Sequence, residues 1–280
     1  MRAFRKLAFV VNVDKAGASA LGDAMIALAR ESGATTVRTF AARQIPRGGF
    51  RHCEACCVIG GDGTLLGVVR EAAREGIPVI GINQGSLGYL TTFSPDEARA
   101  HFADLIGGSY RIASRTLLEC HSGPRRSDLA LNDVLIKAEV NSQLIRLEVH
   151  ADGELVTDYF CDGLVFSTPT GSTAYNLSAG GPIIHPASRV IAMTPICPHT
   201  LSNRTIIFQD GVDLKVYNRS PESRLLVAMD GQRNQVVTRG SPVEVAISRE
   251  RLGLVQRRQY SHFGVMRAKL KWSGGLADRK

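Results

Sequence analysis

Apolar and amphipathic segments alternate around a glycine-rich loop between residues 56 and 82. Residues 56–59 form a short apolar run, typical of a buried strand, and Gly-Gly-Asp-Gly follows directly. Apolar residues over 64–75 then recur at helical spacing, and a second apolar run covers residues 77–82. A strand, a glycine loop, a helix and a strand in this order predict a βαβ unit, and therefore a parallel sheet.

The first hundred or so residues continue the same alternation. Strand-like runs cover residues 7–13 and 35–40, and a helix is predicted over residues 18–32. Ser94-Pro95-Asp96-Glu97 has the pattern of a capping box with proline at the first helical position. We therefore predict an α/β domain with a Rossmann-like parallel sheet up to Gly108.

The pattern changes after Gly108, where short β-rich runs replace the alternation. Asp152-Gly153 stands between two such runs and predicts a hairpin turn. We expect this half to be a predominantly β, sandwich-like domain. Helical spacing returns over residues 262–272, where Phe263 and Met266 share one face with Leu270.

Charge and composition restrict the partners. The formal net charge of +8 favours anionic ligands such as nucleotides. Aromatic residues make up only 6% of the chain and do not interleave with a Lys/Arg run, so we expect no nucleic-acid partner. No apolar run approaches the roughly 20 residues of a membrane helix, so we expect no membrane association.

The spacing of the cysteines favours reduced thiols in the core over a metal site. Cys53 and Cys56 form a C-x-x-C without a second pair at zinc spacing, and Cys57 leads into an apolar run. Core packing is the favoured interpretation, with a metal or redox site as the alternative. Scattered cysteines of this kind fit a reduced, cytoplasmic compartment.

The sequence Gly60-Gly61-Asp62-Gly63-Thr64 places a carboxylate in a loop of the type that surrounds phosphate. A plain Asp-Gly turn is one interpretation. The other is an anion site, because the loop follows a buried strand and opens a helix. The lysine of a P-loop is missing. In such a site an aspartate accepts the proton of an attacking hydroxyl, holds that hydroxyl in line, or binds a metal ion. The loop by itself favours phosphoryl transfer to an alcohol.

Three further segments have ligand-binding patterns, each with a structural alternative. Residues 81–90 form a second glycine loop, in which Tyr89 either stacks on a ligand ring or fills the core. Asn132-Asp133 interrupts an apolar strand, either as a bulge or as hydrogen-bonding groups for ribose or adenine. Residues 161–186 crowd hydroxyl groups before a short predicted helix, which suits a nucleotide, and Tyr175 is placed to pack on a ring.

Together these segments resemble the NAD kinase family. The matching motifs are Gly60 to Thr64, Gly85-Ser86-Leu87-Gly88-Tyr89, Asn132-Asp133, Asp162 to Pro186, Leu201-Ser202-Asn203-Arg204 and Asp230-Gly231-Gln232. The resemblance implies an α/β N-terminal domain and a β-sandwich-like C-terminal domain, with a last helix that packs back on the first domain. The expected domains are residues 1–108 joined by 256–280, and residues 109–255.

The resemblance also implies a reaction. Family members transfer the γ-phosphoryl of ATP, or in some cases of polyphosphate, to the 2′-hydroxyl of the adenosine ribose of NAD, giving NADP. Mg²⁺ or another divalent cation is required. Members assemble as homodimers or homotetramers, with part of the site near the subunit interface.

The family's site residues can be transferred to this sequence one by one. Asp62 matches the catalytic aspartate, Asn132 and Asp133 match residues that bind the adenosine part of NAD, and Asp230 matches a residue near the phosphate donor. The full set of expected substrate-binding and nucleotide-binding residues is Gly61, Gly63, Thr64, Tyr89, Asn132, Asp133, Asp162, Thr170, Thr173, Ala174, Tyr175, Ser178 and Asp230.

Two other functions are alternatives. Lipid kinases share a related Gly-Gly-Asp-Gly-Thr loop, but such an enzyme should lack the hydroxyl-rich run at residues 167–175 and should offer a membrane-facing patch. A non-catalytic nucleotide sensor on the same scaffold would not need the aligned carboxylate of Asp62. Both alternatives explain the sequence less well than an NAD kinase does.

Overall fold

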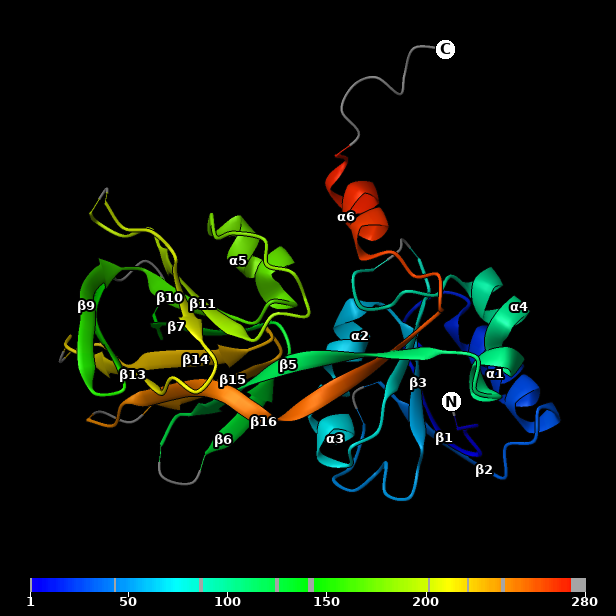
Figure 1. The fold of residues 1–280 in the computed structure, drawn as a ribbon. Helices are drawn as coiled ribbons and strands as arrows, with labels where there is room; N and C mark the ends of the chain where they lie inside the picture. Colours follow the sequence, from blue (N-terminus) through cyan, green and yellow to red (C-terminus); the bar gives the residue numbers. More distant parts are fainter. Residues whose placement is uncertain are drawn as a thin grey trace, which may run out of the picture. The chain divides into compact units, whose positions relative to one another are not determined.

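The computed structural model describes residues 2–42, 44–85, 88–123, 126–140, 144–200, 202–220, 222–237 and 240–272. Ser86, Leu87 and Leu201, which belong to the motifs above, lie outside the described residues, as does the expected end of the first domain, residues 273–280. The chain forms two compact units, residues 1–113 with 253–280, and residues 114–252. In Figure 1 the helices and strands are coloured by their position in the sequence, from blue to red.

A parallel sheet forms the centre of the first unit. Its strands are β1 (Lys6–Val11), β2 (Thr36–Ala41), β3 (Ala55–Gly60) and β4 (Val79–Asn83). They stand in the order β2-β1-β3-β4, and every pairing between neighbours is parallel. Strands β3 and β4 are buried along their whole length, as is typical of the inner strands of a parallel sheet. The predicted parallel sheet is therefore confirmed.

Two helices of the first unit lie side by side, α1 (Ala18–Glu31) and α4 (Pro95–Ile106) (Figure 1). Their apolar faces are buried in the same core as the sheet residues. Helix α4 begins with the predicted capping box. The Glu97 amide donates to Ser94 Oγ at 3.2 Å, and the Ser94 amide donates to the Glu97 carboxylate at 2.9 Å.

The single helix predicted over residues 64–75 is wrong, because two short helices stand there. They are α2 (Asp62–Leu66) and α3 (Val69–Arg74). The break includes Gly67, and glycine is about 1 kcal/mol less favourable than alanine inside a helix. The apolar face on either side of the break is nevertheless buried, as at Leu65 and Val69.

Strand β16 (Val243–Gln256) belongs to both units, since the division falls between Leu252 and Gly253. Within the first unit, its residue Leu254 pairs in parallel with Val79 of β4. The chain thus returns to the first unit after completing the second. In the part of the chain that the structure describes, no helix is long and apolar enough to cross a membrane.

Helix α6 (His262–Leu270) is the last described helix and belongs to the first unit (Figure 1). The Gly264 amide donates to Ser261 Oγ at 3.1 Å, which caps its first turn. Met266 is buried, but Phe263 is 59% exposed. The apolar face predicted for this helix is therefore only partly covered.

The second unit is built mainly from antiparallel strands. A six-stranded sheet has the order β12-β11-β10-β7-β14-β15, and β13 pairs with both β8 and β16 in the other sheet. Strand β5 (Arg111–His121) begins in the first unit and continues into the second from Ser114. The other strands of the second unit, besides β16, are β6 (Ser127–Ala130), β7 (Asp133–Ala138), β8 (Ile145–Ala151), β9 (Glu154–Cys161), β10 (Gly163–Ser167), β11 (Val190–Ile196), β12 (Ile206–Gln209), β13 (Leu214–Asn218), β14 (Leu225–Met229) and β15 (Arg233–Val237).

One apolar core contains residues from both sheets of the second unit, including Leu147 of β8 and Phe166 of β10. This arrangement confirms the predicted β-rich fold class. The predicted hairpin is also present, because β8 and β9 pair antiparallel around Asp152 and Gly153. Both residues have positive φ, 50° and 88°, as the tight primed turn of a hairpin requires.

Candidate active site

Three loops of the first unit follow the carboxyl ends of β1, β3 and β4, and backbone hydrogen bonds join the first and the third of them to the last residues of β3. The Asn12 amide donates to the carbonyl of Ile59 at 2.9 Å, and the Gln84 amide donates to the carbonyl of Gly60 at 2.6 Å. In an open α/β sheet, ligands bind outside the carboxyl ends of the strands. The predicted Gly-Gly-Asp-Gly-Thr motif is the middle loop of the three.

The Asp62 side chain lies against the loop that follows β4. Its Oδ1 accepts the amide of Leu90 at 3.1 Å, the amide of Thr91 at 2.9 Å and the Thr91 hydroxyl at 2.8 Å. Its Oδ2 accepts the amide of Tyr89 at 2.8 Å. A carboxylate offers about four acceptor positions, two on each oxygen. Oδ1 is therefore fully used, whereas Oδ2 keeps an acceptor position for another donor.

Close approach explains two of the glycines in these loops. A Cβ at Gly88 would stand 2.0 Å from Asp62 Oδ1, and a Cβ at Gly60 would stand 2.3 Å from Thr64 Oγ1. Thr64 itself is buried, and its hydroxyl accepts a hydrogen bond from Asn12 Nδ2 at 3.1 Å. Among the expected binding residues, Thr64 thus has a role inside the loop, whereas Gly63 is exposed.

Tyr89 connects the Asp62 loop to the last helix. The Lys269 ammonium of α6 lies 5.9 Å from the centroid of the Tyr89 ring, within cation–π range. Burial and, secondarily, the nearby Asp62 charge raise the pKa of the Tyr89 hydroxyl. Tyr89 is half-buried, which leaves part of its ring open to a ligand.

Asn132 and Asp133 lie in the second unit, at the start of β7, and a buried carboxylate fixes their backbone. Asp230 accepts the amides of Leu131 at 3.0 Å, Asn132 at 2.7 Å and Asp133 at 3.3 Å. Asp230 is 7% exposed and has a positive φ of 52°. Its carboxylate therefore fixes the backbone of Asn132 and Asp133 through their amides.

The Asp133 carboxyl is unusual in its ionisation. Burial, and secondarily the nearby charge of Asp230, raise the pKa of Asp133 to about 7. Burial also raises the pKa of Asp230, against the opposing effect of the amides that it accepts. The buried position of Asp133 and the charge of Asp230 thus both favour the protonated form of the Asp133 carboxyl.

Arg233 and Asp128 support this region of the second unit and were missed from the sequence. Arg233 Nε donates to Asp128 at 2.8 Å, and its Nη2 donates to the Leu129 carbonyl at 2.6 Å. The same Nη2 is 3.9 Å from the Asp230 carboxylate. Because these residues lie about a hundred positions apart, no local pattern could have connected them.

Most hydroxyl groups of the run over residues 167–173 are used within the chain. The Thr168 hydroxyl donates to the Leu131 carbonyl at 2.5 Å, and the Ser172 hydroxyl donates to the Pro169 carbonyl at 2.7 Å. Thr170 is the exception, because its Oγ1 is buried and has no hydrogen-bond partner in the described residues. The high density of hydroxyl groups in this run is therefore partly explained by hydrogen bonds that hold the loop together.

The expected residues that follow this run differ in exposure. Thr173 closes the 3₁₀ turn η1 (Gly171–Thr173), and Ala174 precedes helix α5 (Tyr175–Ser178). Tyr175 is 43% exposed, and Asp162 and Ser178 are exposed as well.

Buried Asn176 holds the α5 segment in place and was missed from the sequence. Its Oδ1 accepts the Thr194 hydroxyl at 2.7 Å, and its Nδ2 donates to the Pro182 carbonyl at 3.0 Å. The backbone of the α5 segment is therefore anchored, and its expected ligand-binding side chains lie at the surface of the second unit.

The cysteines Cys53, Cys56 and Cys57 are buried, and burial raises the pKa of all three thiols. Metal ligation needs the thiolate. In the described ranges, no three His, Cys, Asp or Glu side chains group as metal ligands. The burial of the three thiols and their raised pKa values support the core-packing interpretation of the C-x-x-C.

Sequence comparison extends over both units. The sequence model of the ATP-NAD kinase N-terminal domain matches residues 2–110, and that of the ATP-NAD kinase C-terminal domain matches residues 131–257. The chain belongs to the NAD kinase family. An NAD kinase of Azotobacter vinelandii (strain DJ / ATCC BAA-1303) is 40% identical over 230 residues, 80% of this chain and 78% of that protein. An NAD kinase of Pseudomonas putida (strain GB-1) is 39% identical over 233 residues, 81% of this chain and 78% of that protein.

Solved structures share the fold. A yeast NADH kinase complexed with NADH has a TM-score of 0.79 and 24% identity, covering 98% of this chain and 89% of its own. An NAD kinase from Archaeoglobus fulgidus in complex with ATP also has a TM-score of 0.79, with 23% identity, covering 95% and 98%. Both confirm an α/β unit with a parallel sheet and a β-rich unit in one chain.

Membership of the NAD kinase family fixes the activity class. The chain is a phosphotransferase that uses ATP and NAD and forms NADP. Neither the lipid kinase nor the non-catalytic sensor finds support in these comparisons.

Proposed function

We propose that this NAD kinase transfers the γ-phosphoryl of ATP to the 2′-hydroxyl of the adenosine ribose of NAD, with Asp62 as its catalytic carboxylate. The observation that carries the proposal is the hydrogen bonding of Asp62. Four donors from residues 89–91 fix the carboxylate, and Oδ2 keeps an acceptor position for the incoming hydroxyl. A fixed acceptor can orient the hydroxyl and take its proton as the new P–O bond forms.

The expected residues of the second unit have distinct proposed roles. Asn132 and Asp133 bind the adenosine part of NAD, from a backbone that Asp230 holds. Thr170 supplies a hydroxyl, and its buried, unpartnered oxygen supports this role. Thr173, Ala174, Tyr175 and Ser178 line the nucleotide site, and Asp162 lies beside it. The position of Asp230 supports a positioning role more than direct contact with the donor.

We propose that the divalent cation arrives together with the phosphoryl donor. In the described part of the chain, no three metal-ligating side chains come together. Mg²⁺ usually keeps several water molecules and binds through one or two carboxylates together with substrate phosphates. We therefore expect the ATP phosphates and water to provide most of its ligands. When bound, the cation offsets the charge of the transferred phosphoryl group.

We also propose that the chain works as a homodimer or homotetramer in the reducing cytoplasm. Phe160 is 51% exposed on β9, at the end of a sheet, and exposed Asp162 follows two residues later. Light scattering should give a mass two or four times 30.2 kDa. A mass of one chain at assay concentration would rule out the assembly.

The activity is tested by crossing phosphoryl donors with acceptors. Purified protein with Mg²⁺ should form NADP from ATP and NAD, and phosphorus NMR should place the new phosphate on the 2′ position. Polyphosphate and NADH replace ATP and NAD in parallel reactions, which defines the donor and acceptor range. Phosphorylation of diacylglycerol vesicles, or tight NAD binding without product for every donor, would contradict the proposal.

A further inference from the structure

Lys15 lies in the loop after β1 and was not among the residues expected from the sequence. Its backbone is fixed on both sides: its amide donates to the Asn12 carbonyl at 3.1 Å, and its carbonyl accepts the Ala18 amide at 3.1 Å. The loop is tight, because a Cβ at Gly17 would stand 2.8 Å from Gln84 Nε2. Lys15 therefore has a defined position at the carboxyl end of the sheet.

The Lys15 ammonium contacts both glycine loops. Nζ donates to the carbonyl of Gln84 at 2.9 Å, in the turn after β4. A Cβ at Gly61 would stand 2.9 Å from this Nζ, and a Cβ at Gly85 would stand 3.8 Å from it. Gly61 directly precedes Asp62. The cation thus lies beside the backbone that carries the catalytic carboxylate.

The charge of Lys15 is free to meet a ligand. An ammonium has three N–H donors, and the Gln84 carbonyl uses one of them. Several arginines of the chain, such as Arg2 and Arg219, instead pair with a glutamate. Within the described residues, Lys15 forms no such ion pair. Two spare donors and an uncompensated positive charge suit an oxyanion with several oxygens.

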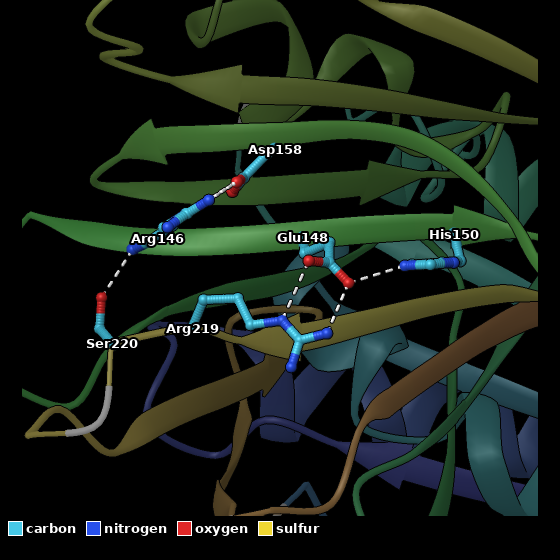
Figure 2. A network of polar contacts seen from close by, with 6 residues as sticks. All are labelled: Arg146, Glu148, His150, Asp158, Arg219 and Ser220. Carbon is cyan, nitrogen blue, oxygen red and sulfur yellow. Dashed lines mark hydrogen bonds and ion pairs between the residues drawn. The ribbon is translucent and has the colours of Figure 1, made fainter.

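The pairing of other cations is clear in the second unit. Figure 2 shows the Arg219 guanidinium on the Glu148 carboxylate, with hydrogen bonds of 2.7 and 3.0 Å, and His150 Nε2 on the same carboxylate at 2.8 Å. Arg146 binds Asp158 in the same network. The Arg219 and His150 contacts lower the pKa of Glu148 to about 2, so this carboxylate stays charged. These cations are already compensated, unlike Lys15.

We propose that Lys15 binds the phosphate groups of the phosphoryl donor. The inference rests on the proposed function, since it assigns a cation to the ATP side of that reaction. The Gly-Gly-Asp-Gly-Thr loop lacks the lysine that a P-loop carries within its own sequence. Lys15 supplies the missing charge from the neighbouring loop. Compact ammonium groups are common phosphate ligands.

A purely structural role is the alternative, in which Lys15 only holds the Gln84 turn. The two roles differ in what a substitution changes. If Lys15 binds phosphate, its loss should weaken the binding of ATP and of inorganic pyrophosphate and leave the binding of NAD intact. Loss of a structural contact should lower thermal stability and weaken both substrates together.

The test compares Lys15→Met and Lys15→Arg with a matched control, Lys6→Met. Lys6 is an exposed lysine at the opposite end of β1, away from the three loops. For each variant, we would measure kcat, the KM for ATP and for NAD, the inhibition constant of pyrophosphate, and the melting temperature. A charge-assisted hydrogen bond is worth about 1.5–3 kcal/mol, or roughly tenfold to a hundredfold in affinity.

We expect Lys15→Met to raise the KM for ATP and the pyrophosphate inhibition constant by roughly tenfold or more. The KM for NAD should stay within about twofold, Lys15→Arg should recover part of the loss, and Lys6→Met should behave as the unsubstituted protein. An unchanged KM for ATP together with an unchanged pyrophosphate inhibition constant in Lys15→Met would overturn the inference. An equal rise of the KM for ATP and the KM for NAD, with a lower melting temperature, would also overturn it. If the unsubstituted protein forms no NADP, the proposed function fails instead.

Discussion

At the scale of a single residue, the hydrogen bonds of Asp62 have two roles. Its four hydrogen bonds hold residues 89–91, and they also fix the carboxylate itself. Gly88 makes this possible, because any side chain there would collide with Asp62 Oδ1. A carboxylate held this firmly loses little freedom when a substrate hydroxyl arrives.

The ionisation of Asp133 predicts a pH-dependent stability. Its pKa is about 7 in the folded protein, whereas an unperturbed aspartate has a pKa of roughly 4. Between these two values the folded protein holds a proton that the unfolded chain has released. Raising the pH through this window therefore lowers the free energy of unfolding, and that loss is complete above about 7.

Urea unfolding between about pH 5 and about pH 8 measures this effect. Asp133→Asn removes the titrating group, so the decline with pH should become shallower. Asp23→Asn, which changes an exposed carboxylate on α1, should leave the decline as it is. An identical decline in Asp133→Asn and the unsubstituted protein would show that Asp133 titrates as an ordinary aspartate.

Residue-level reasoning from the sequence was incomplete where hydrogen bonds link distant parts of the chain. The crowded hydroxyls suggested ligand contacts, yet Thr168 bonds to Leu131, which lies 37 positions away. Lys15 was missed because its partner, Gln84, is 69 positions away. The rule that ligands bind at the carboxyl ends of parallel strands would have indicated the loop, but not which of its side chains faces the site.

Element-level predictions were better because they depend on local patterns. The parallel strands, the Ser94 cap and the Asp152-Gly153 hairpin all follow from the spacing of nearby residues. The helix predicted over residues 64–75 was the exception. Its apolar face is buried as predicted, but the chain forms two short helices there instead of one. Periodicity detects a buried face and is insensitive to a one-residue or two-residue interruption.

At the scale of an element, helix α6 is expected to affect catalysis through its contact with Tyr89. Its Lys269 lies over the Tyr89 ring, and the Tyr89 amide donates to Asp62. A cation–π contact at a half-exposed site is worth about 0.5–1 kcal/mol. Lys269→Met should therefore lower kcat by roughly twofold to fivefold, because the Tyr89 segment becomes less fixed.

Steady-state kinetics with the exposed Arg267→Met as the matched control check this prediction. Arg267 is on the same helix, and its replacement should leave kcat within about twofold. Equal effects of the two substitutions would mean that α6 acts through its overall charge and not through Tyr89.

At the scale of the whole molecule, the chain crosses from the first unit to the second and returns through β16. The two family matches, residues 2–110 and 131–257, likewise cover both units. The sequence predicted both fold classes, since each half has its own periodicity. It also predicted the family, because the ordered motifs come from both units. The side-chain contacts of the site depend on the folded backbone, so motif spacing alone could not supply them.

The most direct test of the account is the rate of the chemical step in two variants. Asp62→Asn removes the proposed acceptor of the 2′-hydroxyl, whereas Thr91→Val removes one hydrogen bond to Asp62 and keeps the carboxylate. Single-turnover formation of NADP should fall about 10²–10⁴-fold in Asp62→Asn, with NAD affinity retained, and less than about tenfold in Thr91→Val. A single-turnover rate in Asp62→Asn equal to that of the unsubstituted protein would contradict the catalytic role of Asp62.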